Sequence, residues 1–322
     1  MYEERLLVDL VKRPGCLLVA NEGGDVTPAA AHVPISLAAR AEAWLSEGES
    51  GIAAARREEI SILTAVELAS SYDEKLRKKA APYALRVSQV AIPQIEALLF
   101  GASYKGVTDF VTKYLWPAPA RRATKWCAER KLTPNLVTTI SALCVVLATV
   151  LFAEAVWLPG LALAWMMTFL DTVDGKLARV TLTSSKWGNI FDHGVDLVHP
   201  PFWYYAWWVG LGRPESSLLI GSLWIIVAGY VVGRLMEGFF LAVYKMEIHA
   251  WRPVDSQFRL ITARRNPNLA LLTMFSLVAA PESGFVAVAI WTIASTVFHT
   301  VRILQAVAGQ IRGNSPRSWL IE

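Results

Sequence analysis

From residue 134 onward the chain is a succession of long apolar segments separated by short charged connectors. Hydrophobic residues make up 54% of the sequence, above the roughly 45–50% of ordinary soluble domains. A membrane-spanning helix needs about 20 mostly apolar residues. We therefore predict an all-α polytopic membrane protein with six transmembrane helices, at residues 135–155, 156–179, 188–211, 217–243, 268–281 and 284–308. The fifth segment is short on apolar residues and must include polar residues at its start.

The first 131 residues differ because charged residues occur throughout them. For residues 1–100 we expect a small cytoplasmic α/β or α+β domain, with helices near 37–47 and 64–79 and a hairpin turn at Gly23-Gly24. Residues 101–131 interleave aromatic and basic side chains, which predicts an amphipathic helical segment in the membrane interface. The six-helix membrane domain then covers residues 132–312, and residues 313–322 form a cytoplasmic tail.

Basic residues are distributed unequally between the two sets of connectors. They concentrate before the first span, between the second and third, between the fourth and fifth, and after the sixth. Because Lys and Arg are enriched in cytoplasmic loops, this set of connectors is predicted to be cytoplasmic. The chain start also lacks the apolar core of a signal peptide. We therefore expect a multi-pass protein of a bacterial inner membrane with both termini in the cytoplasm. Basic residues at membrane edges, rather than along one soluble face, argue against nucleic acid as a partner.

Four aspartates interrupt the apolar pattern between residues 171 and 196. Asp171 and Asp174 are three residues apart. Asp192 and Asp196 are four residues apart. Either spacing places two carboxylates on one face of a helix, one turn apart. Four carboxylates repel one another and are costly to desolvate unless a cation lies between them. Oxygen ligands suit Mg²⁺, Mn²⁺ or Ca²⁺, so the sequence predicts one or two divalent metal ions here.

Two other classes of protein also place carboxylates in a membrane. A transporter or channel uses them for ion binding, but it predicts carboxylates dispersed over several spans. In an inert scaffold the aspartates would merely pair with Lys176, Arg179 and Lys186 and hold two helices together. The clustering of the carboxylates at one cytoplasmic end favours an enzyme over both alternatives.

The spacing of these residues resembles the signature of the CDP-alcohol phosphotransferase (CDP-alcohol phosphatidyltransferase) family. The resemblance extends over about residues 130–310, and the matching pattern is Asp171-x2-Asp174-Gly175-x2-Ala178-Arg179-x8-Gly188-x3-Asp192-x3-Asp196. It implies a membrane enzyme that transfers a substituted phosphate from a CDP-alcohol to an acceptor hydroxyl and releases CMP, in phospholipid or phospho-alcohol biosynthesis. The implied partners are the CDP-alcohol donor, an alcohol or phospho-alcohol acceptor, membrane lipids and a second copy in a homodimer. Gly229 and Gly233 are small residues that would suit such a helix contact.

The resemblance also implies roles for the aspartates. Asp171, Asp174 and Asp192 are implied metal ligands, with Mg²⁺ or Mn²⁺, as a pair of ions, for the cofactor. Asp196 is the implied general base, which takes the proton from the attacking hydroxyl, and it also serves as a metal ligand because the two roles overlap. A polyanionic pyrophosphate needs its charge neutralised, which metal ions held by carboxylates accomplish.

Further candidates surround the aspartates. Gly175 and Ala178 lack bulk and let a nucleotide approach the helix closely. Arg179 is expected to orient aspartates or contact a phosphate. The small residue Gly188 completes the implied nucleotide-binding set. Asn135 and Thr138, at the start of the first span, are candidates for lining the cytidine site, and helix capping is the alternative.

Two arginines, Arg264 and Arg265, lie at the start of the fifth span. They are candidates for binding an anionic group of the substrate. The alternative is the positive charge expected at any cytoplasmic helix end. Arg234 lies well inside the fourth span with Glu237 one turn further on, so we expect it to be paired or to line a cavity.

In some members of the family a soluble nucleotidyltransferase domain precedes the membrane domain and makes the CDP-alcohol. Residues 1–100 occupy that position, but they are short and lack a glycine-rich nucleotide loop. We therefore expect them to have a regulatory or scaffolding role, or to be a reduced remnant, without activity of their own. The identity of the alcohol, and whether the lipid is donor or acceptor, stay open at this point.

Overall fold

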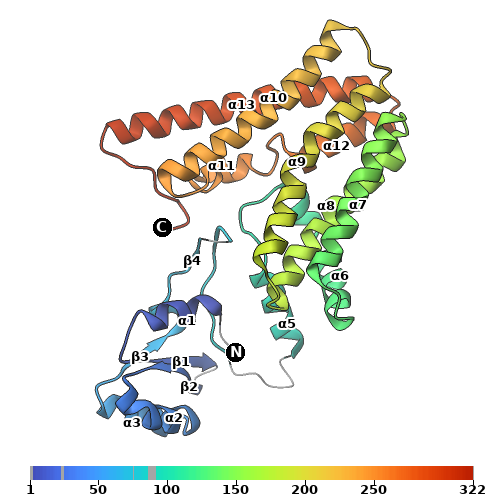
Figure 1. The fold of residues 1–322 in the computed structure, drawn as a ribbon. Coiled ribbons are helices and arrows are strands. Elements are labelled where there is room, and N and C mark those ends of the chain that lie inside the picture. The colour runs from blue at the N-terminus through green and yellow to red at the C-terminus, as the bar shows by residue number, and fades with distance from the viewer. Residues whose placement is uncertain (1–2, 23–24, 75, 86–91, 322) are drawn as a thin grey trace. The chain divides into compact units, whose positions relative to one another are not determined.

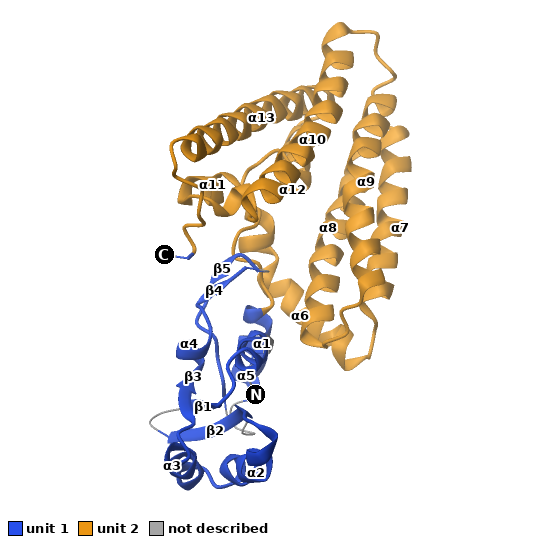
Figure 2. Ribbon diagram, turned by 60° about the vertical axis from the view of Figure 1, so that its left-hand side comes forward, with its two compact units in different colours: residues 1–102, 321 blue, residues 103–320, 322 orange. Residues whose placement is uncertain are grey.

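The computed structural model describes residues 3–22, 25–74, 76–85 and 92–321 of the chain. The chain divides into two compact units, residues 1–102 and residues 103–320 (Figure 2). The predicted hairpin turn at Gly23-Gly24 lies outside the described residues.

The first unit is built on a three-stranded sheet with β1 (Cys16–Glu22) in the middle. β1 pairs antiparallel with β2 (Asp25–His32) and parallel with β3 (Ser61–Thr64). Four helices flank the sheet: α1 (Glu4–Val11), α2 (Ala38–Ser46), α3 (Glu49–Arg57) and α4 (Ala65–Leu68). Successive side chains of β1 point to opposite faces, so Leu18 packs with α1 and α4 whereas Leu17 packs with α2 and α3. Residues 16–20 of β1 are apolar because helices cover both faces of the sheet.

The rest of the first unit contains short elements. They are the 3₁₀ turn Ile35–Leu37, the hairpin of β4 (Tyr72–Asp73) and β5 (Lys78–Lys79), and α5 (Ile92–Ala102). The predicted helix near 37–47 corresponds to α2, whereas the predicted helix at 64–79 is wrong. Thr64 and Glu67 form a capping box that starts α4, but the extended backbone at Ala69 ends the helix after one turn and leads the chain into β4.

The second unit is helical. Its elements are the π-helix Val111–Leu115, α6 (Pro117–Glu129), α7 (Pro134–Ala153), α8 (Trp157–Val180), α9 (Lys186–Gly210), α10 (Ser217–Tyr244), the 3₁₀ turn Ile248–Ala250, α11 (Pro253–Phe258), α12 (Arg265–Leu277) and α13 (Pro281–Ile311). A helix occupies each of the six predicted spans, in the order α7, α8, α9, α10, α12 and α13.

Among the described residues, α7, α10 and α13 are long and apolar enough to cross a membrane, judged by length and composition. α8 and α9 fall outside this group because aspartates and basic residues lie within them, and α12 has only 13 residues. The helical membrane-protein class is therefore confirmed, whereas the number of six spans stays a prediction.

Aromatic side chains hold the helices of the second unit together. α7 packs against both α8 and α9, α10 lies beside α13, and α12 packs on both α8 and α13 (Figure 1). The buried ring of Phe152 on α7 meets the rings of Trp203 and Trp207 on α9, at centroid distances of 5.9 Å and 5.1 Å. Such ring pairs add about 0.5–1.5 kcal/mol beyond their burial. This packing fixes α9 against α7 and so sets where the polar segment of α9 lies.

Helices α10 and α13 approach each other closely at Gly229. A Cβ atom at this position would lie 2.3 Å from Cγ2 of Thr292 on α13, so the contact requires a glycine. Gly229 thus packs against a helix of its own chain, and the homodimer stays a prediction. A Cβ on Gly233 would meet no atom of the described structure within 4 Å.

Replacing Gly229 with valine should lower the free energy of unfolding by about 1–3 kcal/mol, because the added carbons must displace Thr292. Thermal unfolding in detergent micelles measures this. Gly221→Val is the matched control, since it lies on the same helix and its Cβ would meet no described atom within 4 Å. Equal losses in the two variants would contradict the close packing of α10 on α13.

Candidate active site

Helices α8 and α9 bring aspartates together because only residues 181–185 separate them. Ser185 starts α9 as its N-cap, and its hydroxyl accepts a hydrogen bond from the backbone N–H of Gly188 at 3.0 Å. One ligand atom from each of Asp171, Asp192 and Asp196 lies within 4.8 Å of the others. The structure thus gathers three of the four predicted metal ligands into one group.

Asp174 lies next to this group but has a different environment. It is 2% exposed, and its Oδ2 accepts a hydrogen bond of 2.6 Å from the hydroxyl of Thr138 on α7. That hydroxyl also lies 3.1 Å from the carbonyl oxygen of Pro134. Asp174 Oδ1 is buried with no partner among the described residues. The N-cap of α7 is Thr133, so Thr138 does not cap the helix and instead holds one of the aspartates.

Arg265, the first residue of α12, reaches into the aspartate group. Its guanidinium donates hydrogen bonds to Asp171 through Nη2 and to Asp196 through Nη1. The Arg265 and Asp171 side chains are each 18% exposed, and that of Asp196 is 37% exposed. A guanidinium suits this position because its fixed fork of donors can bind two carboxylates at once. The predicted candidate Arg265 is thus part of the site.

The two small residues of α8 lie beside Arg179. A Cβ on Gly175 would lie 3.3 Å from Nη2 of Arg179, so the guanidinium folds back over the glycine. Asp174 and Asp192 are among the charged groups that act on Arg179. Ala178 is half-buried, and its carbonyl oxygen accepts a hydrogen bond from the N–H of Thr183 in the α8–α9 loop. Arg179 therefore lies close enough to interact with the aspartates, and its role in orienting them stays a prediction.

Asn135 at the start of α7 approaches Gly188 at the start of α9. A Cβ on Gly188 would lie 2.8 Å from Oδ1 of Asn135, so glycine permits this approach. Beside them is an open groove of about 540 Å³, lined by Asn135, Trp187, Ile190, Phe191, Gly194 and Val195. Asn135 and Gly188 are thus neighbours across two helices, next to a largely apolar groove.

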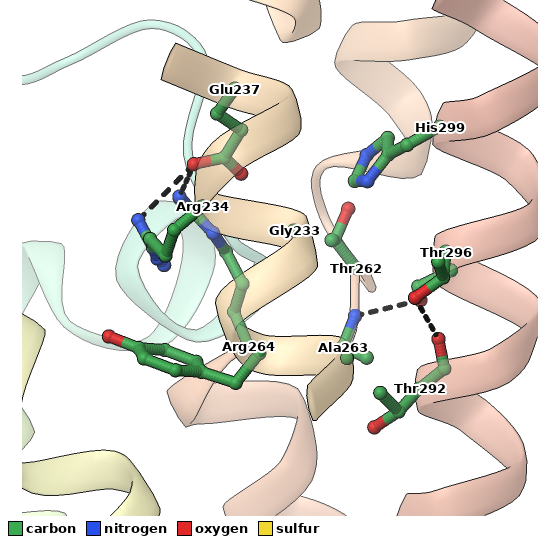
Figure 3. A pocket seen from close by; sticks show the side chains of 12 residues that line it. Gly233, Arg234, Glu237, Thr262, Ala263, Arg264, Thr292, Thr296 and His299 are labelled. Carbon is green, nitrogen blue, oxygen red and sulfur yellow. Dashed lines mark hydrogen bonds and ion pairs between the residues drawn. The ribbon is translucent and has the colours of Figure 1, made fainter. Parts of the chain in front are cut away.

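Arg264 points away from the aspartates and binds Glu237 on α10. Glu237 also accepts a hydrogen bond of 3.2 Å from Arg234 and lies 3.2 Å from Nε2 of His249. Figure 3 shows Glu237 with the two arginines on one side of a small pocket, and His299 with Thr292 and Thr296 on the other. The cavity of about 20 Å³ has room for one water-sized group. The predicted pairing of Arg234 is confirmed, and Arg264 and Arg265 serve different clusters.

His249 completes this cluster, and its contact with Glu237 could not be predicted from the sequence. Its ring is buried in the 3₁₀ turn between α10 and α11. Burial lowers the pKa of His249 to about 3, although the hydrogen bond with Glu237 opposes this shift. His249 is therefore neutral at physiological pH and acts as a hydrogen-bonding partner of Glu237. Its distance of 12 residues from Glu237 gives no periodic signal that could have found the pair.

The aspartate group fits a divalent metal. It offers only carboxylate oxygens, which Mg²⁺ and Mn²⁺ prefer. The ligand atoms of the three carboxylates lie within 4.8 Å of one another, which is close enough for one cation to bind all three. The buried, unpartnered Oδ1 of Asp174 adds one more oxygen whose hydrogen-bonding capacity is unused within the described structure. The donor set and its geometry thus support metal binding at α8 and α9.

The sequence model of the CDP-alcohol phosphatidyltransferase family matches residues 131–302, which is more than half of the chain. The chain therefore belongs to this family. The matched region contains all of α7 to α12 and with them the aspartate group.

The individual proteins that the chain resembles share 30% or less of its residues in the aligned regions. A phosphatidylinositol phosphate synthase from Mycobacterium marinum is 30% identical over 107 residues, which cover 32% of this chain and 46% of that protein. A bifunctional IPC transferase and DIPP synthase from Thermococcus kodakarensis is 25% identical over 232 residues, covering 66% of this chain and 49% of that protein. The chain spans about half the length of these curated relatives. The crystal structure of a Mycobacterium tuberculosis phosphatidylinositol phosphate synthase with CDP-DAG bound has a TM-score of 0.45 and 16% identity, covering 56% of this chain and 92% of that one.

Replacing Thr138 with valine should weaken Mn²⁺ binding by about 10-fold to 100-fold, because loss of a hydrogen bond to a metal-site carboxylate has effects of this size. Mn²⁺ titration followed by electron paramagnetic resonance measures it. Thr139→Val is the control, since the Thr139 hydroxyl binds only the carbonyl oxygen of Asn135 among the described groups. Unchanged Mn²⁺ affinity in Thr138→Val would remove Thr138 from the site.

Proposed function

We propose that this chain is a divalent-metal-dependent CDP-alcohol phosphotransferase. It transfers a substituted phosphate from a CDP-alcohol to an acceptor hydroxyl and releases CMP, in phospholipid or phospho-alcohol biosynthesis. The observation that carries this proposal is the convergence of Asp171, Asp192 and Asp196 within the segment that matches the family.

The cofactor is Mg²⁺ or Mn²⁺, bound as a pair of ions. Asp171, Asp192 and Asp196 would hold it, together with the inward-facing Asp174. When bound, such ions neutralise the pyrophosphate and stabilise CMP as the leaving group. Arg179, beside Gly175, would orient the aspartates or contact a phosphate, which a guanidinium can bind through two donors.

Asp196 is the proposed general base. Its side chain is 37% exposed, compared with 18% for Asp171 and 27% for Asp192. Asp196 is thus the carboxylate in this group that an incoming hydroxyl can reach most easily. The hydrogen bond from Arg265 orients its carboxylate, and the proton of the attacking hydroxyl passes to an oxygen of Asp196 as the new ester bond to phosphorus forms.

The substrate is proposed to be partly lipid and partly anionic. The groove beside Asn135 presents Trp187, Ile190 and Phe191, which suits the apolar portion of a lipid next to a nucleotide. Asn135, Thr138, Gly175, Ala178 and Gly188 would then line the nucleotide site. Because one relative is a phosphatidylinositol phosphate synthase, we favour a phosphorylated alcohol as acceptor.

Arg264 and Arg265 are the proposed contacts for an anionic substrate group. Both guanidinium groups are engaged with carboxylates in the structure. An incoming phosphate would therefore have to share the donors of Arg265 with Asp171 and Asp196, or displace Glu237 from Arg264. Arg265 is the better placed of the two because it already lies in the aspartate group.

The proposed setting is a bacterial inner membrane that the protein crosses six times, as a homodimer. The domain limits are residues 1–100, 101–131, 132–312 and 313–322, and both termini and the aspartate group face the cytoplasm. The alternating basic connectors support this orientation. It places the aspartates on the side of the membrane where soluble nucleotides are found.

Replacing Asp196 with asparagine should lower the rate of CMP release by about 10²-fold to 10⁴-fold, which is the usual contribution of a general base. CMP is measured after incubating the purified protein with a panel of CDP-alcohols, acceptors and Mg²⁺ or Mn²⁺. Asp9→Asn, in the first unit, is the control, and size-exclusion chromatography checks that both variants are folded. CMP release at the wild-type rate from Asp196→Asn would rule out this residue as the base.

The first unit is proposed to have no nucleotidyltransferase activity. The full-length protein, incubated with CTP and phosphorylated alcohols, should release no pyrophosphate above the background of a boiled sample. CTP-dependent pyrophosphate release would overturn this proposal and assign to residues 1–100 the synthesis of the CDP-alcohol.

A further inference from the structure

Residues 103–116 precede the first membrane helix and were predicted to lie in the membrane interface. In the structure, several of their side chains are buried within the second unit: Ser103, Val107, Thr108, Asp109 and Val111. Asp109 is a carboxylate that is only 7% exposed. Burying a charge is costly unless the charge is paired and hydrogen-bonded, so its partners indicate what it does.

Asp109 has a full set of partners. Its Oδ1 accepts hydrogen bonds from the backbone N–H of Thr112 at 3.0 Å and from Nδ2 of Asn266 at 2.9 Å. Its Oδ2 accepts one from the Thr112 hydroxyl at 2.8 Å. Burial opposes ionisation, but the charge of Arg259 and these hydrogen bonds outweigh it and lower the pKa of Asp109. Asp109 is therefore a charged anchor between two distant parts of the chain.

The anchored element is the first turn of α12. Asn266 is the second residue of this helix, directly after Arg265, and it is 4% exposed. A carboxylate is well placed at a helix N-terminus because the helix dipole is positive there. The backbone N–H of Phe110 adds a second tie, a hydrogen bond of 2.9 Å to the carbonyl oxygen of Leu260 just before α12. The segment thus holds the start of α12 at two points.

A third contact connects the same segment to α8. The Nζ atom of Lys176 lies 3.5 Å from the centroid of the Tyr104 ring, and Lys176 is 3% exposed. Lys176 is two residues beyond Asp174. Residues 103–116 therefore contact both helices whose side chains, Arg265 and Asp171, meet in the aspartate group.

We propose that Asp109 is a positioning residue of the active site. Its hydrogen bond with Asn266 fixes the first turn of α12. This turn sets the position of the Arg265 backbone, from which the guanidinium extends to Asp171 and Asp196. Asp109 lies outside the aspartate signature and contacts none of the four aspartates in the described structure. The role rests on the proposed phosphotransferase activity, because Asp196 is the proposed base that Arg265 orients.

Replacing Asp109 with alanine should reduce kcat for CMP release by about 10-fold to 100-fold, since small misplacements of reacting groups have effects of this size. The KM for the CDP-alcohol should stay within about threefold of the wild-type value, because the donor site is expected beside Asn135 and Gly188. Asp109→Asn keeps the volume and one acceptor oxygen, and it gives a folded variant with a smaller loss. Glu129→Gln, an exposed carboxylate on the neighbouring α6, is the control.

A double-mutant cycle tests the connection between Asp109 and α12. If Asp109 acts through Asn266, the combined Asp109→Ala and Asn266→Ala protein should lose no more kcat than the more affected single variant. Losses that multiply would show that the two residues act independently and would overturn the proposal. A kcat for both Asp109 variants within twofold of Glu129→Gln would also overturn it.

Hydrogen exchange measured by mass spectrometry separates this proposal from the proposed function. Amides in the first turn of α12 should exchange faster in Asp109→Ala than in the wild type or in Glu129→Gln. This measurement needs no substrate. If the wild-type protein releases no CMP but exchange at α12 still rises in Asp109→Ala, the phosphotransferase function fails while the anchoring of α12 stands. Unchanged exchange would refute the anchoring itself.

Discussion

Repulsion between carboxylates is the constraint on which the second unit depends. Asp171, Asp192 and Asp196 meet within 4.8 Å, and like charges this close destabilise one another. The structure counters this with Arg265, which binds two of the three. The helix that carries Arg265 therefore starts beside the aspartates, and it packs against both α8 and α13. Metal ions of the kind proposed here would complete the neutralisation.

The parts of the site that sequence reasoning captured are those with local spacing. The aspartate pairs are three and four residues apart, so helical periodicity alone places each pair on one face. The partners of these residues were harder to find. Arg265 is 94 residues from Asp171, and Thr138 is 36 residues from Asp174. The sequence predicts Arg265 as a contact for an anionic substrate group, and its bridging position between two aspartates depends on how α12 packs.

The apolar pattern located the membrane helices, but it was less informative where elements are short. The predicted helix at 64–79 failed because its polar residues also suit a single helical turn followed by a hairpin. In residues 103–116 the aromatic and basic side chains indicate a helix in the membrane interface, and this pattern gives no sign that Asp109 is buried. A single carboxylate forms no periodic pattern in the sequence. The role of Asp109 depends on its hydrogen bonds with Thr112 and Asn266, and only the tertiary fold brings Asn266 close.

The order of the elements along the chain has a consequence for how this protein is made. Synthesis proceeds from the N-terminus, so the hairpin of α8 and α9 emerges before α12. Asp196 precedes Arg265 by 69 residues, which means that the aspartates can meet before their arginine has been synthesised. During that interval, water and ions must screen the carboxylates. The addition of α12 then pairs Arg265 with Asp171 and Asp196, so assembly of the helical unit is coupled to the neutralisation of its aspartate group.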